Sequence, residues 1–255
     1  MKRLRYAYAL LAALIICGSV AAQQHRRPLR WGGGVDDELL HFGFGFHYVH
    51  ADYKIALKPE WQQTAFIDEN GDPAQLLGVS SPFTHGVGLG LLADLKLGEN
   101  ANLRFTPTLV FSDKTVNYRY TPTATLEHDR YISKEVKASY IDLPLLFKFK
   151  SDRKGNYRGY LIGGGKYAVN VTSSKRYDDS SSEGQFQKFL KSKPGYFSYE
   201  VGIGFDLYFD YFKMSPEIRW VQSIGNLLDA REPNMYNNPI DRLMLRNLQV
   251  SLYFE

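Results

Sequence analysis

Apolar and polar residues alternate along much of this chain, and residues 197–211 show the pattern at its longest. Every odd position of that run is apolar or aromatic, and the even positions carry mainly serine, glycine and acidic residues. A period of two residues is that of a β-strand with one apolar face. The run exceeds the roughly five or six residues usual for strands of globular proteins. Its aromatic residues lie toward both ends, which is typical of strands that cross a membrane in a β-barrel.

The alternation recurs in other segments of the chain. They share an apolar or aromatic residue at nearly every second position, with glycine, charged or hydroxyl-bearing residues between. These segments are residues 42–48, 87–97, 103–111, 141–149, 214–224 and 248–254. Residues 157–170 are rich in glycine and tyrosine, and the pattern does not assign their two faces. With them, the sequence predicts about eight strands.

The lengths of the connections predict how these strands are joined. Long connections at 59–83, 113–134, 172–195 and 226–242 alternate with short ones at 98–101, 151–156 and 210–213. Outer-membrane barrels have short periplasmic turns and long external loops, whereas a Greek-key sandwich does not produce this alternation. No segment after the N-terminus reaches the roughly 20 apolar residues of a transmembrane helix. We therefore predict an all-β fold, a transmembrane antiparallel up-and-down β-barrel of about eight strands.

The N-terminus has the pattern of a secretory signal peptide. Basic residues within the first five positions precede an apolar stretch at 6–17, and small residues at 18–22 end it; these are the three regions of a cleaved signal. A membrane anchor is the alternative, but the stretch is short for a span of about 20 residues. A lipoprotein signal with Cys17 as the lipidated residue is a further alternative, disfavoured by the bulky Ile16 before it.

The predicted domain division follows from this leader. Residues 1–22 form the signal peptide, residues 23–38 a periplasmic N-terminal segment and residues 39–255 the outer-membrane barrel. Cys17 is the one cysteine of the chain, so cleavage leaves no disulfide, thiol catalyst or thiolate metal site. The periplasmic segment is basic at residues 26–30. It either docks on an acidic partner or on lipid headgroups, or it is a solvated terminus.

The composition agrees with a barrel and excludes other classes. Aromatic residues make up 15% of the chain and charged residues 23%, and the mean hydropathy is slightly negative. A helical membrane protein is more apolar than this, whereas only every second residue of a barrel strand faces lipid. The net charge of +4 is small, and no basic helix or zinc spacing accompanies it, so the sequence predicts no nucleic-acid partner.

The strand face opposite the apolar one carries charges of both signs. The candidates are Asp142, Lys148, Lys150, Arg158, Lys166, Glu200, Asp206, Glu217 and Arg219. The interior of a barrel of about eight strands is just wide enough to be filled by side chains, and unpaired buried charge is costly. These charges should therefore pair with one another in a plugged interior. Glycines such as Gly202 and Gly204 on the same face make room for larger neighbours.

Histidines and a glycine run raise the question of ligand sites. His41 and His47 share a predicted strand face but lie about 20 Å apart along it, too far to share one metal ion. His50 would need a partner from another strand, so we interpret all three as lumen or rim residues. The glycines at 163–165 precede Lys166 and a tyrosine, where a phosphate-binding loop requires Lys-Ser or Lys-Thr at the start of a helix. They are interpreted as strand glycines.

Catalytic motifs are not found. The chain has no G-x-S-x-G elbow, Ser215 and Ser223 have no histidine in the same predicted strand pair, and His128 lies in a predicted long loop. A nucleophile needs a base within hydrogen-bond reach. We therefore predict no enzyme, and no catalytic, cofactor or metal site.

One stretch resembles a known family. Residues 140–151, Tyr-Ile-Asp-Leu-Pro-Leu-Leu-Phe-Lys-Phe-Lys-Ser, place an acidic residue, an apolar residue and proline before an apolar run that ends in lysine. This resembles the mid-barrel strand of small outer-membrane barrels of Bacteroidetes. The continuation over 152–167, Asp-Arg-Lys-Gly-Asn-Tyr-Arg-Gly-Tyr-Leu-Ile-Gly-Gly-Gly-Lys-Tyr, is similar to the PorT (SprT) family of the type IX secretion system. Length, leader and loop order agree over essentially all of the mature chain.

The resemblance implies a function in protein export. PorT-like barrels are non-enzymatic outer-membrane components that are required for cargo proteins to reach the cell surface, and they are not the main conduit. Expected partners are outer-membrane lipid and other secretion-system proteins, with no small-molecule substrate and no cofactor. The alternative is a small outer-membrane barrel that binds or transports a hydrophobic ligand, or a structural barrel.

Overall fold

The computed structural model describes residues 36, 38–63, 65–67, 73–122, 130–136, 139–172, 190, 192–229 and 236–255. No helix in this part of the chain is long and apolar enough to cross a membrane. One 3₁₀ turn accompanies the strands: β1 (Leu40–Leu57), η2 (Trp61–Gln63), β2 (Ala65–Ile67), β3 (Pro73–Ser80), β4 (Thr84–Lys96), β5 (Ala101–Phe105), β6 (Thr108–Phe111), β7 (Lys114–Tyr120), β8 (Arg130–Val136), β9 (Ser139–Lys150), β10 (Tyr157–Asn170), β11 (Gly195–Tyr208), β12 (Lys213–Ile224) and β13 (Ile240–Phe254).

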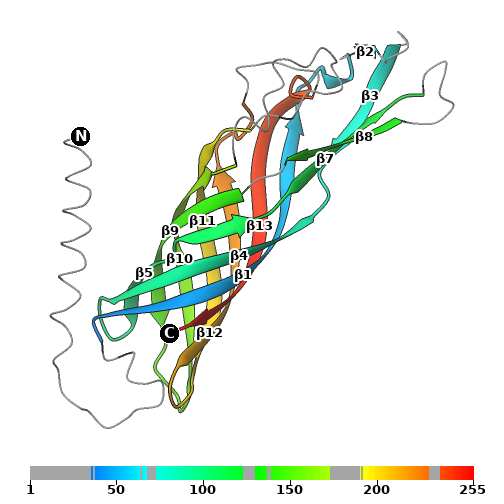
Figure 1. Ribbon diagram of the computed structural model, residues 1–255. Coiled ribbons are helices and arrows are strands. Elements are labelled where there is room, and N and C mark those ends of the chain that lie inside the picture. Colours follow the sequence, from blue (N-terminus) through cyan, green and yellow to red (C-terminus); the bar gives the residue numbers. More distant parts are fainter. Residues whose placement is uncertain are drawn as a thin grey trace, which may run out of the picture. The chain divides into compact units, whose positions relative to one another are not determined.

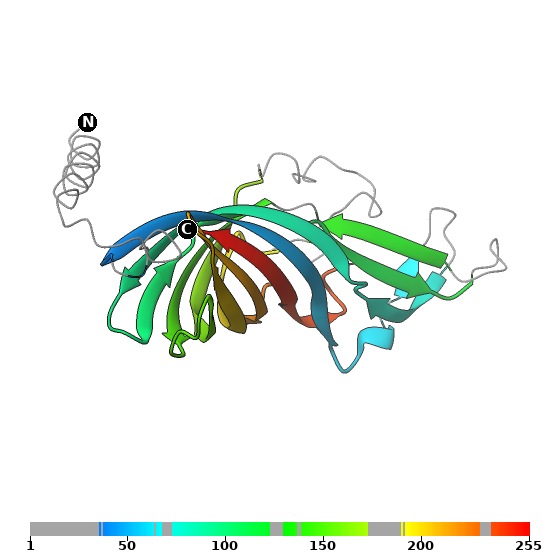
Figure 2. The ribbon, with the colours of Figure 1, turned by 90° about the horizontal axis from the view of Figure 1, so that it is seen from below.

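The described strands close into a ring. Its order is β1-β13-β12-β11-β10-β9, then β5 and β6 together, then β4, which pairs again with β1. Each of these pairings is antiparallel, and the first strand, in blue, lies beside the last, in red, in Figures 1 and 2. With β5 and β6 taken as one strand, the ring has eight positions. This confirms the predicted antiparallel barrel.

The ring position between β4 and β9 is shared by two short strands, β5 and β6. Both pair with the same two neighbours in one continuous register. The break between them falls at Pro107, which has no N–H to donate to a sheet. Its carbonyl still accepts a 3.0 Å hydrogen bond from the Leu91 N–H. β5 and β6 are therefore the single predicted strand 103–111, interrupted by proline.

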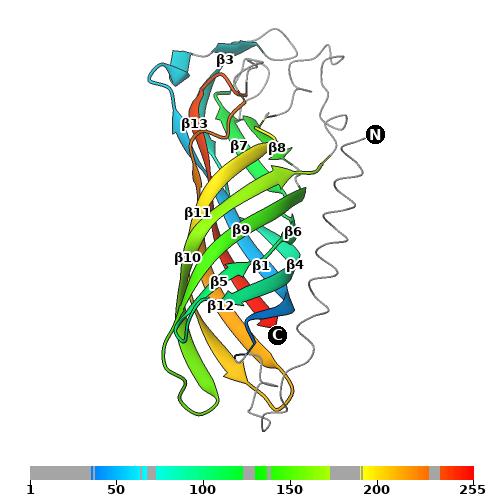
Figure 3. The same ribbon diagram turned by 90° about the vertical axis from the view of Figure 1, so that its left-hand side faces the viewer.

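The short connections lie at one end of the ring, which we call the short-turn end. They join β4 to β5, β9 to β10 and β11 to β12. Figure 3 shows β9, β10 and β11 running obliquely away from this end. In the turn after β9, Gly155 has a φ of +61°, a left-handed conformation that glycine adopts without steric penalty. The start of β1 and the end of β13 belong to the same end, because Phe44 is the partner of Phe254.

A second antiparallel sheet extends beyond the other end, the long-loop end. Its order is β2-β3-β7-β8, and Figure 1 shows β3, β7 and β8 beyond the ring. Two of the predicted long connections, 59–83 and 113–134, therefore contain strands. The reason is visible in β7, where Val116, Tyr118 and Tyr120 alternate with polar residues and are buried.

Side chains divide between the two faces of the ring as the alternation predicts. Along β11, the odd-numbered residues from Phe197 to Phe205 are exposed, whereas Ser198, Glu200 and Asp206 are buried. The exposed residues are apolar and face outward, toward lipid in a membrane barrel. The buried polar residues face the lumen.

Strand β10, whose faces the pattern does not assign, follows the same rule. Ile162 and Lys166 are buried in the lumen, and Leu161 is exposed on the outer face. Inward glycines on β11 make room for the large side chains of β10, because a Cβ added to Gly204 would overlap the ring of Tyr160. This agrees with the predicted role of the lumen glycines.

Candidate functional site

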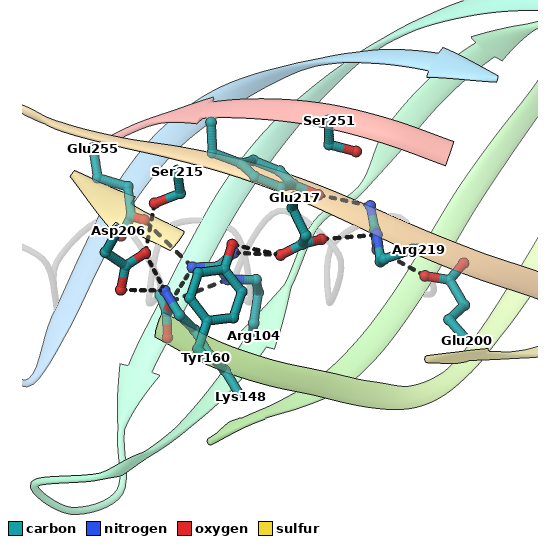
Figure 4. Close-up of polar contacts among 12 residues, drawn as sticks. Arg104, Lys148, Tyr160, Glu200, Asp206, Ser215, Glu217, Arg219, Ser251 and Glu255 are labelled. Carbon is teal, nitrogen blue, oxygen red and sulfur yellow. Dashed lines mark hydrogen bonds and ion pairs between the residues drawn. The ribbon is translucent and has the colours of Figure 1, made fainter. Parts of the chain in front are cut away.

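The centre of the polar lumen is Arg104, on β5 (Figure 4). Its guanidinium Nη2 is 2.7 Å from Asp94 Oδ2 on the neighbouring β4. It also reaches across the barrel, with Nη1 3.3 Å from Glu217 Oε2 on β12 and Nη2 3.4 Å from Glu255 Oε1 after β13. One guanidinium with its five N–H donors thus bridges carboxylates of three different strands or strand ends.

Beside this centre, Lys148 of β9 pairs with Asp206 of β11. The Lys148 Nζ is 2.8 and 2.9 Å from the two carboxylate oxygens, and it lies 4.0 Å from the ring centroid of Tyr160. The hydroxyl of Ser215 donates to the same Asp206 carboxylate at 2.7 Å. The Tyr160 hydroxyl donates to Glu217 at 2.8 Å, which joins this pair to the Arg104 centre.

A second group of charges continues the network toward the long-loop end. The guanidinium of Arg219 lies 2.7 Å from Glu200 and 2.9 Å from Glu217, and it donates to the Tyr253 hydroxyl at 2.7 Å. Lys166 Nζ lies 3.0 Å from Glu200 and 2.8 Å from Asp142. The ion pairs therefore form one connected chain along the lumen.

The predicted pairing is confirmed for the inward charges other than Lys150, which is buried without an ion pair among the described residues, and the structure adds members that were not predicted. The predicted inward charges come from β9 to β12 and do not include Asp94, Arg104, Lys213 and Glu255, whereas His41 was predicted as a lumen or rim residue. The alternation of apolar and polar residues could have identified two of them as inward charges, since Asp94 and Arg104 alternate with apolar neighbours on their strands. Because the alternation marks faces and not neighbours across the barrel, their mutual contacts were not predictable.

The polar lumen is closed to solvent in this part of the chain. The side chains of Arg104 and Lys148 are 0% exposed and that of Arg219 is 2% exposed. Charges that line a water-filled channel would be accessible to water. Close to Arg219 and Glu200, His47 forms hydrogen bonds with Ser251 at 2.8 Å and with Gln249 at 2.9 Å, so neutral polar side chains share the lumen with the ion pairs.

Toward the long-loop end, the lumen becomes apolar and aromatic. The buried residues of this cluster include Val49, Ala51, Tyr53, Val110, Tyr140, Ala168, Tyr196 and Leu245. The rings of Tyr140 and Tyr196 meet edge to face, with centroids 5.6 Å apart. The cluster continues into the second sheet through Val116 and Tyr118. The interior is thus filled by charged pairs at one end and by an ordinary apolar core at the other.

The core of the second sheet keeps its tyrosines neutral. Burial raises the pKa of Tyr118 well above its usual value, and its hydroxyl donates to the carbonyl of Tyr236 at 2.9 Å. Burial likewise lowers the pKa of Lys134, whose Nζ lies 4.4 Å from the ring centroid of Tyr236. These contacts fix the sheet to the segment that precedes β13.

The short-turn mouth of the lumen is crossed by the segment before β1. The Asp36 carboxylate lies 3.4 Å from Arg158 of β10 and 3.6 Å from Lys213 of β12, and it accepts a hydrogen bond from the Tyr208 hydroxyl. Lys213 also pairs with Glu255 at 2.9 Å. Arg158, one of the predicted inward charges, thus lies at this mouth, and a charged cluster seals it.

Three possible metal ligands meet near the same mouth. His41, Asp94 and Glu255 offer ligand atoms within 4.8 Å of one another, and His41 Nε2 is 2.7 Å from Glu255. The carboxylates are already neutralised, however, by Arg104 and Lys213. These cations occupy the place that a metal ion would need, so the cluster does not fit a metal.

The candidate catalytic serines have other partners. Ser215 donates to Asp206, and Ser223 accepts a 2.8 Å hydrogen bond from the Leu245 N–H. Neither forms a hydrogen bond with a histidine in the described part of the chain. The predicted signal peptide, residues 26–30 and His128 all lie outside the described residues.

The outer face changes from apolar to polar at one level near the long-loop end. Tyr48, Val87 and Val250 are exposed partners in three neighbouring strands. Two residues further toward the long-loop end, His50 stands opposite His85. The next partners are Asp52 of β1 and Arg246 of β13, whose guanidinium pairs with that carboxylate. On β1, β4 and β13, this level marks the edge of the apolar, lipid-facing belt on the side of the long-loop end. We call it the upper edge of the belt.

The family that the chain matches agrees with this architecture. The family model described as outer membrane protein beta-barrel domain matches residues 21–229. Among solved structures, Neisserial surface protein A is similar over 85% of this chain and 98% of its own, with 10% identity and a TM-score of 0.40. The outer membrane protein OprG from Pseudomonas aeruginosa is similar over 84% of this chain and 91% of its own, with 11% identity and a TM-score of 0.40.

A third similar structure is the attachment invasion locus protein Ail of Yersinia pestis, solved in complex with the heparin analogue sucrose octasulfate. The similarity covers 84% of this chain and 96% of Ail, with 9% identity and a TM-score of 0.35. None of the curated proteins matches the chain.

Proposed function

Since the chain belongs to the outer membrane protein beta-barrel domain family, we propose that it is a non-enzymatic component of the type IX secretion system. In this proposal it is required for the export of cargo proteins to the cell surface and acts through the outside of a closed barrel. As a member of an outer-membrane barrel family, the chain contacts membrane lipid through its apolar outer face.

The observation that carries the proposal is the filled lumen. Arg104 is fully buried and bridges Asp94, Glu217 and Glu255 across the barrel. An eight-strand interior is just wide enough for side chains, so neither a folded cargo nor a small solute has a path through it. A barrel of this kind can act only through its loops, its lipid face or its periplasmic end.

The link to type IX secretion rests on the resemblance of residues 140–167 to the PorT family. In the structure, this stretch forms most of β9, the turn after it and most of β10. Its Lys148 and Lys166 take part in the lumen ion pairs, and its turn is exposed at Asp152 and Lys154. Such a hairpin stabilises the closed barrel and presents a charged surface at the short-turn end.

The exposed turn is held in a defined conformation. The Arg153 guanidinium carbon lies 3.7 Å from the centroid of the Tyr208 ring, and Arg153 Nε donates to the Gly155 carbonyl at 2.9 Å. Short turns of outer-membrane barrels face the periplasm. A rigid charged turn there suits a contact with a periplasmic or inner-membrane partner of the secretion apparatus.

The absence of enzymatic activity is part of the proposal. Within the described residues, Arg104, Lys148 and Ser215 of the lumen centre are engaged in ion pairs or hydrogen bonds with carboxylates. The family resemblance supplies no catalytic residue.

Deletion of the gene tests the proposed function. In an organism with a type IX system, the deletion strain should retain cargo in the periplasm, and the wild-type gene should restore cargo to the surface. A Lys154→Glu variant should restore export less well, because it reverses a charge on the β9–β10 turn. Glu99→Lys, in the exposed β4–β5 turn, is the matched control.

Normal export in the deletion strain would contradict the proposal. That outcome would favour the alternatives, a structural barrel or a barrel for a hydrophobic ligand. Equal effects of Lys154→Glu and Glu99→Lys, with both proteins folded in the outer membrane, would leave the export role standing but would remove the assignment of the contact to the β9–β10 turn.

A further inference from the structure

The outer face of the barrel carries a pair of histidines where β1 lies beside β4. His50 and His85 are direct partners in the antiparallel ladder, and their Nδ1 atoms are 3.4 Å apart. Tyr48, two residues before His50 on the same face, places its hydroxyl 2.5 Å from the Nδ1 of His85. Three polar atoms therefore converge on the outside of the ring, separate from the lumen network.

Hydrogen bonds within this group cannot engage both Nδ1 lone pairs at once. A neutral imidazole has a single acceptor nitrogen, so the lone pair of His85 Nδ1 serves one strong hydrogen bond. If it accepts the proton of Tyr48, it is not free for His50. A cation between the rings would instead accept the lone pairs of both histidines, and the phenol oxygen would add a further ligand.

The separation of the two nitrogens fits a particular class of cation. Zinc binds histidine nitrogen at about 2.0–2.1 Å with tetrahedral geometry, which places two ligand nitrogens about 3.3–3.4 Å apart. The observed distance is 3.4 Å. We propose that His50 and His85 form a binding site for a divalent transition-metal ion of the zinc class, with Tyr48 as a third ligand.

Stacking holds both imidazoles in place without the ion. His50 stacks on Phe83 with ring centroids 4.4 Å apart and planes 16° apart. His85 stacks on Tyr48, with centroids 5.7 Å apart and planes 23° apart. Preorganised ligands lose little conformational freedom on binding. The two imidazoles are already at ligand spacing, whereas the Tyr48 hydroxyl, 2.5 Å from His85 Nδ1, must move away from that nitrogen to become a ligand.

The nearest charged groups do not oppose a cation. The guanidinium of Arg246 lies 5.8 Å from the Phe83 ring, but Asp52 neutralises it through two hydrogen bonds of 2.9 and 2.5 Å. The His41 cluster in the lumen differs in this respect, because Arg104 binds its carboxylates directly. The outer pair is therefore the better metal site among the described residues.

The position of the pair keeps it accessible. It lies at the upper edge of the lipid-facing belt, and His85 is exposed. Zinc sites that use fewer than four protein ligands keep open positions for water. Because both histidines lie on the outer face, the remaining positions on a bound ion would be reached from outside the barrel.

Titration of zinc chloride into the purified, detergent-folded protein tests the site. The protein carries a tag without histidine, and isothermal calorimetry should show one equivalent of bound Zn²⁺. His50→Ala and His85→Ala should each weaken binding at least tenfold, because each removes one arm of the chelate. Tyr48→Phe, which keeps the ring, should cause a smaller loss. His128→Ala, which removes a histidine elsewhere in the chain, is the matched control and should bind as the wild type does.

A second measurement uses the unchanged protein and so does not depend on the folding of variants. Cu²⁺ added at one equivalent should give an electron paramagnetic resonance spectrum with two coordinated imidazole nitrogens. Zinc affinity within threefold of wild type in the His50→Ala/His85→Ala double variant would overturn the proposal. So would a copper spectrum of the unchanged protein without two such nitrogens.

Discussion

The carboxylate of Asp36 accepts a 2.5 Å hydrogen bond from the hydroxyl of Tyr208, a residue 172 positions further along the chain. β11, which carries Tyr208, is separated from β1 in the ring by β13 and β12. The segment before β1 therefore leaves its own strand and reaches across the short-turn mouth. Arg158 of β10 and Lys213 of β12 form ion pairs with the same carboxylate.

Loss of this contact should release the segment before β1. Burial acts to raise the pKa of Asp36, but Lys213, Tyr208 and Arg158 outweigh it and hold the pKa below its usual value. The contact is thus fully present above the unfolded pKa of about 3.9 and is lost as the pH falls through the lower folded value. Asp36→Asn should remove about 1.5–3 kcal/mol of local stability at pH 7. Limited proteolysis of the folded barrel measures this as faster cleavage before β1; an unchanged cleavage rate would refute it.

Arg104 should be the most sensitive residue of the lumen. Arg104→Met leaves Asp94, Glu217 and Glu255 without their shared cation, and breaking a buried ion pair in this way costs about 3–5 kcal/mol. Unfolding in urea, followed by the change in gel mobility of the heat-modifiable barrel, measures the loss. Arg242→Met is the control, since its pair with Asp241 is exposed and should be worth no more than about 1 kcal/mol. Equal stability of the two variants would contradict the network.

Ile203 and Gly202 test the two faces of β11 separately. Ile203 is 54% exposed, and Ile203→Arg should cost about 2–4 kcal/mol if it lies near the bilayer midplane. Gly202→Ala should also destabilise the barrel, but by crowding, because its new Cβ would overlap the Ile218 carbonyl and Arg219. Refolding into lipid vesicles separates the causes: thicker bilayers should worsen only the arginine variant. Insertion of Ile203→Arg at wild-type yield would show that the register is wrong.

The topology predicts which connections are reached from outside the cell. An epitope at Ser181, in a predicted long loop outside the described residues, should be labelled on intact cells. An epitope at Gly155, in the β9–β10 turn, should be labelled only after the outer membrane is opened. The reverse labelling would invert the barrel in the membrane.

The filled lumen predicts a barrel that does not conduct. Purified protein in planar bilayers should give no large, stable current steps, because fully buried Arg104 and Lys148 leave no water path. The Arg104→Met variant offers a comparison, since loosening of the centre should produce at most brief, irregular openings. Steady porin-like conductance of the unchanged protein would disprove closure.

The strands and their faces were predictable because alternation of period two is a local property. Residues 197–211 predicted β11 and its two faces, and only its last residues, around Phe209, leave the strand for the turn. The two faces of strand β10 were harder to predict, because the run Gly163, Gly164 and Gly165 lacks the contrast between apolar and polar side chains on which the pattern depends. The second sheet was missed because its short strands lie within stretches that are polar on average.

The partners across the lumen were not predictable from the pattern. Arg104 meets Glu217 at a sequence separation of 113 residues, and only ring closure and strand tilt decide which inward side chains share a level. The pair His50 and His85 was missed for a related reason. His50 needs a partner from another strand, and the β1–β4 register that supplies His85 depends on the closure of the barrel.

The Arg104 bridge has a consequence for how the protein is made. Two of its three carboxylate partners, Glu217 and Glu255, come from β12 and from the residue after β13, so before the last strands are in place Arg104 can pair with Asp94 alone. Completion of the network therefore coincides with closure of the ring. We expect a barrel that lacks its final hairpin to be less stable than the intact one, because the contacts of Arg104 across the lumen are then missing.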